Sequence, residues 1–144
     1  MSENASSASA LRALLKATRT IAVVGMSANP ERPSHYVARY MLEHGYTIIP
    51  VNPRYDEILG LRCYDSLRDV PERIDMVNVF RRAEDVPPVG DDAIAIQAKS
   101  LWLQLGITHA ETARRATAAG LTVVMDLCLK VEHDRLCPGY RADA

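Results

Sequence analysis

The stretch Thr20-Ile-Ala-Val-Val-Gly25 decides the fold class. It is a short apolar run, rich in β-branched residues, and it ends at a glycine. Such a run is typical of a strand that is buried on both faces of a parallel sheet. We therefore predict a strand at 20–25 and expect the rest of the chain to supply helices for both faces of its sheet.

The same pattern recurs along the chain. Helical spacing predicts helices at 10–18, 33–44, 89–99 and 110–119, and apolar runs predict further strands at 46–51, 74–80, 101–104 and 121–125. Strands that alternate with helices of this length imply right-handed crossovers between parallel strands. The predicted fold is a single α/β domain over residues 10–144, a doubly wound parallel sheet of about five strands with helices on both faces.

Three features leave the local structure open. Residues 1–9 are small and polar, and we expect a flexible tail there. Pro50 falls inside the predicted strand 46–51, although proline cannot donate to a ladder; either the strand is shorter or it is locally bulged. Leu11, Leu14 and Leu15 share one face of the first helix, and their spacing fits packing on the domain as well as a dimer seam.

Composition excludes several functional classes. Hydrophobic residues make up 48% of the chain, so a packed core can form. A net charge of −1, from 17 basic and 18 acidic residues, removes the electrostatic reason to expect nucleic acid or a membrane surface as partner. We find neither an apolar run of membrane-spanning length nor a secretory signal pattern. The three cysteines, Cys63, Cys128 and Cys137, are too few and too scattered for a disulfide framework, so we expect a cytoplasmic protein.

The carboxyl ends of the predicted strands indicate where a ligand would bind. In an open parallel sheet, the ligand lies outside these ends, at the point where the connections diverge. The segments that follow the strands are 25–34, 52–55, 80–82, 104–106 and 126–130. Four of the five contain Arg or Lys and none contains a pair of carboxylates. An anionic small molecule therefore fits this edge better than acid–base chemistry does.

Segment 25–34 departs from the dinucleotide pattern Gly-x-Gly-x-x-Gly. The three glycine positions read Gly25, Ser27 and Pro30, and the second strand ends in Asn52-Pro53 instead of an acidic residue that would hold a ribose. Binding of NAD is therefore weakly supported. A helix that begins near Pro33 still offers unpaired N–H groups to an anion.

Polar side chains surround that helix start. Ser27, Asn29 and Ser34 are neutral donors, and Arg32 can grip a phosphate with two hydrogen bonds. The alternative is a long capped connection with a surface arginine. We favour phosphate binding, because the loop, the helix start and the arginine coincide at the predicted switch point.

The remaining segments allow two interpretations each. Phe80-Arg81-Arg82 fits a solvated basic turn as well as a second phosphate contact with an apolar wall. Trp102 fits the core better than a ligand contact, and Gln104, at the end of a buried strand, needs a polar partner. The spacing of Cys128, His133 and Cys137 lacks the close cysteine pair of a zinc site, and no signature supports a catalytic cysteine.

Several motifs in order carry a family resemblance. The chain resembles the small stand-alone bacterial CoA-binding domain proteins in VVGMSANPERPSHYVARYMLEHGYTIIPVNPRYDEILGLRCYDSL (23–67), VNVFRR (77–82), WLQLG (102–106) and CLKVEHDR (128–135). These proteins are Rossmann-like and are related to the CoA-binding domain of the succinyl-CoA synthetase alpha subunit. The resemblance covers about residues 20–135 and implies that residues 10–144 form one CoA-binding Rossmann-like domain.

The resemblance also implies a set of contacts to coenzyme A. The 25–34 loop would cradle the phosphates, the turn after the second strand would flank the adenosine, and residues 80–82 would border the diphosphate and the pantetheine arm. Arg54 or Arg82 would suit the 3′-phosphate, which CoA has and NAD lacks. The cofactor-binding candidates are Gly25, Ser27, Ala28, Asn29, Arg32, Pro33, Ser34, Asn52, Pro53, Arg54, Phe80, Arg81, Arg82, Trp102, Gln104 and Lys130.

The functional hypothesis is a small-molecule binder without catalysis of its own. In the related ligase, the phosphorylated histidine belongs to a second domain, so we expect CoA or a short acyl-CoA to be bound here but not synthesised. The alternative is an NAD(P)-binding oxidoreductase or redox sensor, which rests on the fold alone. A third hypothesis is a mixed disulfide between Cys128 and the CoA thiol. The sequence does not identify a protein partner.

Overall fold

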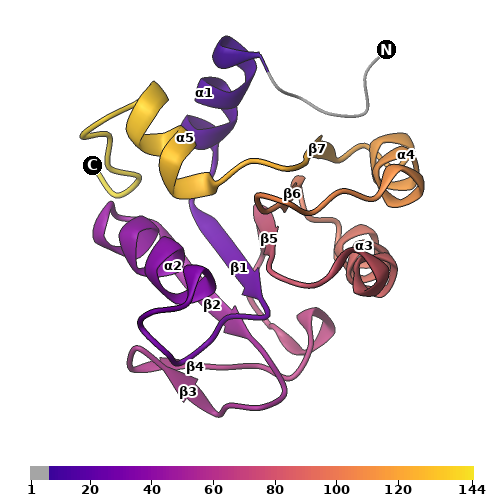
Figure 1. The fold of residues 1–144 in the computed structure, drawn as a ribbon, viewed down its shortest axis with the longest axis horizontal. Coiled ribbons are helices and arrows are strands. Elements are labelled where there is room, and N and C mark those ends of the chain that lie inside the picture. Colours follow the sequence, from indigo (N-terminus) through magenta and orange to yellow (C-terminus); the bar gives the residue numbers. More distant parts are fainter. Residues whose placement is uncertain (1–6) are drawn as a thin grey trace.

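A computed structural model describes residues 7–144 and contains one five-stranded parallel sheet (Figure 1). The strands are β1 (Thr20–Val24), β2 (Thr47–Val51), β5 (Met76–Val79), β6 (Ser100–Leu103) and β7 (Thr122–Val124). Their order in the sheet is β2-β1-β5-β6-β7. The chain thus winds outward from β1 to β2, returns to the other side of β1 at β5 and continues to β7. The doubly wound, Rossmann-like α/β fold is confirmed, and its switch point lies between β1 and β5.

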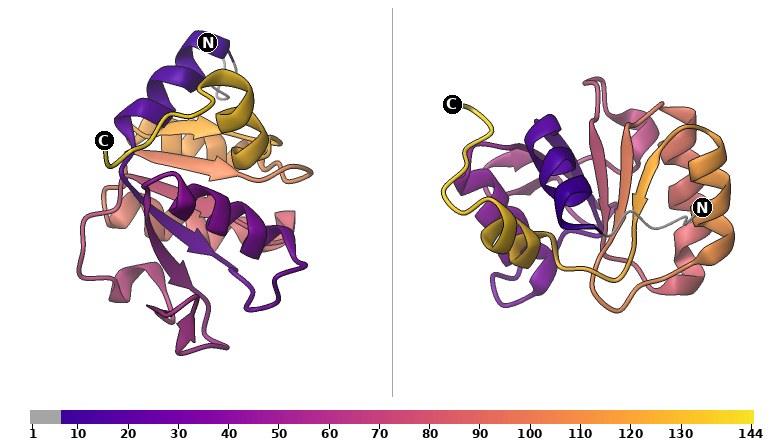
Figure 2. Two further views of the ribbon diagram at one scale, coloured as in Figure 1. Left: turned by 90° about the vertical axis from the view of Figure 1, so that its left-hand side faces the viewer. Right: turned by 90° about the horizontal axis from the view of Figure 1, so that it is seen from above.

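Helices cover both faces of the sheet (Figures 1 and 2). The helices α1 (Ala8–Ala17), α2 (Pro33–Glu43) and α5 (Leu129–Leu136) lie on one face, and α3 (Val86–Ala95) and α4 (Ala110–Ala118) lie on the other. Each face has its own apolar core: Leu11, Val37 and Leu129 pack in the first. Val86 and Ala113 pack in the second. Burial on both faces explains why the strand sequences are apolar throughout.

Some elements differ from the sequence prediction. Helix α3 begins at Val86, not at residue 89, because the two prolines that follow Val86 fit the first turn of a helix. Helix α5 was not predicted, and neither was the hairpin of β3 (Glu57–Ile58) and β4 (Leu61–Arg62). Two-residue strands are too short to show a period, and α5 buries two polar residues, Glu132 and His133, which interrupt its apolar stripe.

Pro50 lies within β2 without shortening or bulging it. The register runs unbroken from Thr20 opposite Thr47 to Val24 opposite Val51, with Pro50 opposite Val23. The Pro50 carbonyl accepts a hydrogen bond of 3.0 Å from the Tyr64 N–H. The nitrogen and the carbonyl of one strand residue point the same way, so the proline nitrogen faces away from β1. Because β2 is an edge strand, the missing donor costs the sheet no ladder bond.

The N-terminal helix packs on the domain. Ser7 caps α1 by accepting a hydrogen bond from Ala10, so residues 7–9 belong to the helix and its cap and not to a flexible tail. Residues 1–6, the rest of that predicted tail, lie outside the described residues. Leu11 and Leu15 are fully buried in the core of the same chain, so these two residues pack on the domain, and Leu14 is partly buried against the same core.

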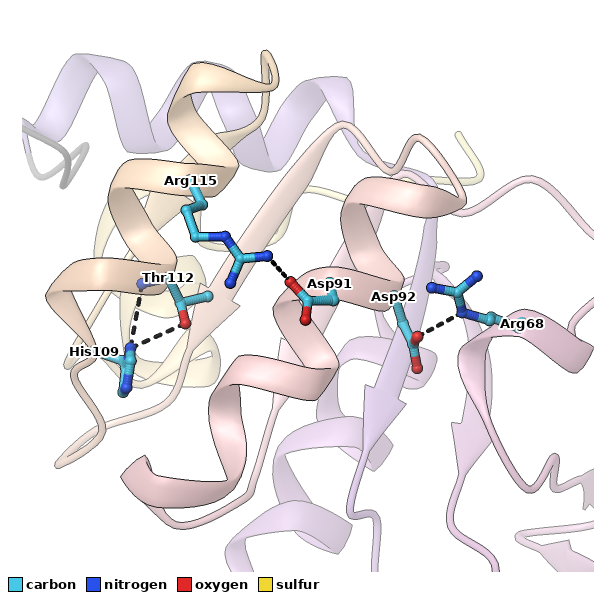
Figure 3. Close-up of polar contacts among 6 residues, drawn as sticks. All are labelled: Arg68, Asp91, Asp92, His109, Thr112 and Arg115. Atoms are coloured by element: carbon cyan, nitrogen blue, oxygen red, sulfur yellow. Dashed lines mark hydrogen bonds and ion pairs between the residues drawn. The ribbon is translucent and has the colours of Figure 1, made fainter.

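Helices α3 and α4 approach closely at Gly90. A Cβ at this position would collide with the Cγ2 methyl of Thr112. Thr112 is held in turn by its hydroxyl and its N–H, both of which contact Nδ1 of His109, the N-cap of α4 (Figure 3). Ion pairs from Arg115 to Asp91 and from Arg68 to Asp92 flank this contact at the surface (Figure 3).

A buried histidine joins α2, α5 and the C-terminal segment. His133 is 0% exposed; its Nε2 lies 3.1 Å from the Tyr140 carbonyl and its Nδ1 2.8 Å from the Tyr40 hydroxyl. Because a carbonyl only accepts, Nε2 carries the proton and Nδ1 accepts from Tyr40. Burial, together with the neighbouring His44, lowers the pKa of His133. The neutral His133 ring therefore links α2, α5 and the C-terminal segment through two hydrogen bonds.

Candidate ligand-binding groove

A groove of about 890 Å³ opens at the carboxyl ends of β2, β1, β5 and β6. This is the edge where the strand order predicts a ligand. Most of the candidates from the sequence meet there. The lining residues are Gly25, Ser27, Asn29, Arg32, Pro33, Ser34, Asn52, Arg54, Tyr55, Phe80, Arg81, Arg82, Ala83, Gln104, Leu105, Gly106 and Ile107.

Gly25 forms the floor of the groove. Its φ of +85° lies in the left-handed region, and a Cβ there would collide with the Phe80 carbonyl. Around it, the Gly25 N–H donates to Val51 across 2.8 Å, and the Phe80 N–H donates to Val24 across 2.9 Å. The ends of three neighbouring strands are thus tied together, and only glycine fits between them.

Hydrogen bonds within the 27–34 loop fix its shape. Ser34 Oγ accepts from the Ser27 N–H, Ser27 Oγ from the Asn29 N–H, and Asn29 Oδ1 from the Glu31 N–H, at 2.9–3.0 Å. Each side chain uses its acceptor for the loop. The hydroxyl hydrogens of both serines and the Nδ2 hydrogens of Asn29 are therefore left to donate to a ligand. Three neutral donors gather at the start of α2, as the sequence predicts.

Asn52 is a support for the groove more than a direct contact. It is only 5% exposed, and its Nδ2 donates to the Met26 carbonyl across 3.0 Å. Its Oδ1 accepts from the Arg54 N–H, also at 3.0 Å, in an Asx turn. The turn places Arg54 and Tyr55 on the groove wall. The sequence could place Asn52 at this edge, but not its bond to a residue so distant in the chain.

The groove is lined by four arginines and by no Asp or Glu. Arg82 is 79% exposed and pairs with Glu84 and Asp85 at 3.3 and 3.5 Å. Within residues 7–144, no ion pair engages Arg32, Arg54 or Arg81. Such a surface attracts anions, and guanidinium groups match phosphate geometry especially well.

Four candidates lie outside the groove lining. Trp102 is fully buried, and its Nε1 donates to the Leu127 carbonyl across 2.8 Å, so it belongs to the core. The Lys130 ammonium lies over the rings of Tyr36 and Tyr40, 5.5 and 5.6 Å from their centroids. Ala28 and Pro53 are exposed beside the groove. Gln104 does line it, but its Oε1 accepts from the Leu129 N–H at 3.4 Å, which supplies its polar partner.

Several lining residues were not among the candidates: Tyr55, Ala83, Leu105, Gly106 and Ile107. All follow strands at the correct edge. Tyr55 stands beside an arginine that was predicted, and an aromatic residue in that turn is a usable signal. The others are small or apolar loop residues without a chemical signature.

Two of the three cysteines, Cys63 and Cys137, are buried. Burial raises the pKa of the Cys63 and Cys137 thiols, so both remain protonated at neutral pH. In the described part of the chain, no group of three or more His, Cys, Asp or Glu side chains could hold a metal ion. The same part contains no helix that is long and apolar enough to cross a membrane.

A second hollow, of about 500 Å³, lies at the opposite edge of the sheet. It is lined by residues at or just after the C-terminal ends of α3 and α4, namely Ile94, Gln97, Ala98, Lys99, Ala119, Gly120 and Leu121. Lys99 is the one charged residue in this lining, and its ammonium lies 3.9 Å from the Asp75 carboxylate. The arginine-lined groove is therefore the better anion site.

Comparison with known proteins identifies the family. Residues 19–134 match the family model described as a CoA binding domain. The chain belongs to this CoA-binding domain family. It is 43% identical over 123 residues to the uncharacterized protein YneT of Bacillus subtilis, covering 85% of this chain and 91% of that protein. A hypothetical protein from Pyrococcus horikoshii superposes with a TM-score of 0.88 at 38% identity, covering 91% of this chain and 92% of that one.

The chain also resembles part of some longer proteins, which are CoA ligases. The chain is 36% identical over 73 residues to acetate–CoA ligase [ADP-forming] II of Archaeoglobus fulgidus. That match covers 49% of this chain but only 11% of the ligase. The expected membership in a CoA-binding domain family is thus confirmed, and the ligase that the chain partly resembles is an acetate–CoA ligase.

Proposed function

We propose that this CoA-binding domain protein holds coenzyme A, or a short acyl-CoA, in the groove at the carboxyl edge of its sheet. The observation that carries the proposal is the lining itself, with four arginines and no carboxylate, in a chain of this family. CoA carries a diphosphate and a separate 3′-phosphate, so it needs several cationic groups spread along one site.

The order of the strands suggests how the ligand would lie. The diphosphate would sit at the start of α2, where the serine hydroxyls and Arg32 converge. The adenosine would lie over the end of β2, against the Tyr55 ring, with its 3′-phosphate at Arg54. Arg54 is the better candidate for this phosphate than Arg82, because Arg82 already pairs with two carboxylates. The pantetheine arm would then run over β5 and β6.

The proposed role is binding, as carrier, buffer or sensor, in a cytoplasmic setting. The lining contains no histidine, cysteine, lysine or carboxylate, so it offers neither an acid–base pair nor an activated nucleophile of the usual kinds. The ligases it resembles extend far beyond the matched region, and their activity is not carried over to this chain.

Calorimetric titration of ligand-free protein tests the proposal. We expect micromolar binding of CoA, with dephospho-CoA about ten- to a hundredfold weaker because it lacks one charge-assisted contact. The Arg54→Gln variant should bind CoA and dephospho-CoA equally, whereas Arg114→Gln, on the exposed side of α4, should behave like the wild type. Absence of CoA binding, or tighter binding of NADH than of CoA, would overturn the proposal.

A further inference from the structure

The end of β6 gives the groove an apolar rim, which we define as Leu105, Gly106 and Ile107. All three line the groove. Leu105 is 66% exposed, more than the other exposed large apolar residues of the described chain, Val131 at 54% and Leu59 at 38%. A large apolar side chain that stays in water at the edge of a ligand groove is suited to contact the ligand.

The rim is held in place from two sides. The Gly106 N–H donates to Asp126 Oδ1 across 2.6 Å, and the Ile107 N–H donates to the Gln104 carbonyl across 2.9 Å. Asp126 is itself fixed, because its own N–H donates to the Leu103 carbonyl across 3.0 Å. The turn therefore keeps Leu105 outside the core and next to the groove.

The rim is also the end of the groove that holds no arginine. The four arginines follow β1, β2 and β5, and β6 contributes none. Neighbouring strands lie about 4.8 Å apart, so the end of β6 is roughly 10 Å from the end of β1, across β5. A pantetheine arm that starts from phosphates at α2 is long enough to cross this distance. Leu105 and Ile107 would therefore be within reach of the sulfur end of a bound CoA.

We infer that the rim binds the acyl chain of a CoA thioester and that the protein prefers short, straight-chain acyl-CoA to free CoA. This inference rests on the proposed function and names the ligand class within the same groove. A free thiol offers the rim little apolar surface, whereas a butyryl group offers three carbon atoms beyond its carbonyl. Burying those carbons against Leu105 and Ile107 removes apolar surface from water on both partners.

Titration with CoA, acetyl-CoA and butyryl-CoA tests the inference. We expect butyryl-CoA to bind about three- to tenfold more tightly than CoA, since one fully buried methylene is worth roughly fourfold and the rim is partly open. Leu105→Ser should remove this preference, so that CoA and butyryl-CoA bind the variant with affinities within about twofold of each other. The matched control is Leu59→Ser, an exposed leucine on the β3–β4 hairpin outside the groove, which should keep the preference.

The outcomes separate this inference from the proposed function. If the wild type binds CoA and butyryl-CoA equally, the acyl preference is wrong while the proposed function stands. If Leu105→Ser and Leu105→Ala weaken both ligands equally, the rim contacts the pantetheine arm and not an acyl chain. If the wild type binds neither ligand, the proposed function itself fails.

Discussion

The side-chain amide of Asn52 donates a hydrogen bond of 3.0 Å to the main-chain carbonyl of Met26. This bond joins the segments that follow two neighbouring strands, β2 and β1, directly beneath the groove. On its other side Asn52 accepts from the Arg54 N–H, so one buried side chain sets the distance between the phosphate loop and the proposed adenosine turn.

We therefore expect Asn52→Ala to damage both stability and binding. The change leaves a buried carbonyl and a turn N–H without partners, which costs about 1–3 kcal/mol of unfolding free energy. CoA affinity should fall because Arg54 loses its support. Urea unfolding and calorimetry measure the two effects. Asn29→Ala, which also removes the acceptor of a turn N–H but at an exposed position, is the matched control and should cost less stability. A variant as stable as the wild type would contradict the supporting role of Asn52.

Gly25→Ala should be more harmful than a comparable change elsewhere. Both Gly25 and Gly60 have positive φ, +85° and +73°, but a Cβ at Gly25 meets the Phe80 carbonyl while one at Gly60 meets nothing within 4 Å. Gly60→Ala should therefore cost about 1 kcal/mol for backbone strain alone. Gly25→Ala adds the collision and should lower the melting temperature further and weaken CoA binding. Equal losses for the two variants would show that β1 and β5 separate easily at this edge.

The contact between α3 and α4 can be tested by loss and rescue. Gly90→Ala places a methyl group against Thr112 Cγ2 and should destabilise the protein by about 1–3 kcal/mol. Thr112→Ser removes that methyl and keeps the hydroxyl that contacts His109 (Figure 3). The double variant should recover much of the loss, as a double-mutant cycle in urea would show. Additive losses would mean that the two positions do not meet.

The buried His133 ring predicts a pH dependence of the unfolding free energy. The pKa of His133 is lowered in the folded state, so below its ordinary value of about 6.5 the unfolded chain binds more protons. The contribution of His133 is therefore complete above that value and is lost as pH falls towards the lower, folded pKa. Unfolding free energies from about pH 8 to about pH 5 should decline more steeply for the wild type than for His133→Asn. If His133→Asn kept the wild-type slope, the slope would come from other groups and the buried neutral ring would not be its source.

The sequence predicts those parts of the fold that depend on local pattern. The apolar run 20–24 predicts a strand buried on both faces. Arg32 and Arg54 could be placed at the groove from the sequence, because a ligand lies at the carboxyl ends of parallel strands and the strand ends alone locate these residues. Trp102 shows the limit of the family resemblance. The resemblance placed Trp102 among the ligand contacts, whereas the residue type alone favoured the core. The structure has it fully buried, with its Nε1 donating to the Leu127 carbonyl.

The features that the sequence did not predict depend mostly on contacts between segments that are distant in the chain. The buried face of α5 cannot be recognised in the sequence, because it contains the polar residue His133. The hydrogen-bond partners of His133, Tyr40 and Tyr140, lie outside α5. The apolar rim has no signature either, since Leu105 becomes informative only when its exposure beside the groove is known. The hydrogen bond from Asn52 to the Met26 carbonyl could not be predicted for the same reason, because it joins two segments that are distant in the sequence.

The most direct test of the central claim is to map the CoA site by NMR. A titration of ¹⁵N-labelled protein should shift the backbone amide signals of Gly25, Ser34 and Gly106, which border the groove, and leave Gly120, at the second hollow, unchanged. Shifts of Gly120 and Gln97 without shifts of Gly25 and Ser34 would place the ligand at the opposite edge of the sheet. That result would contradict the account.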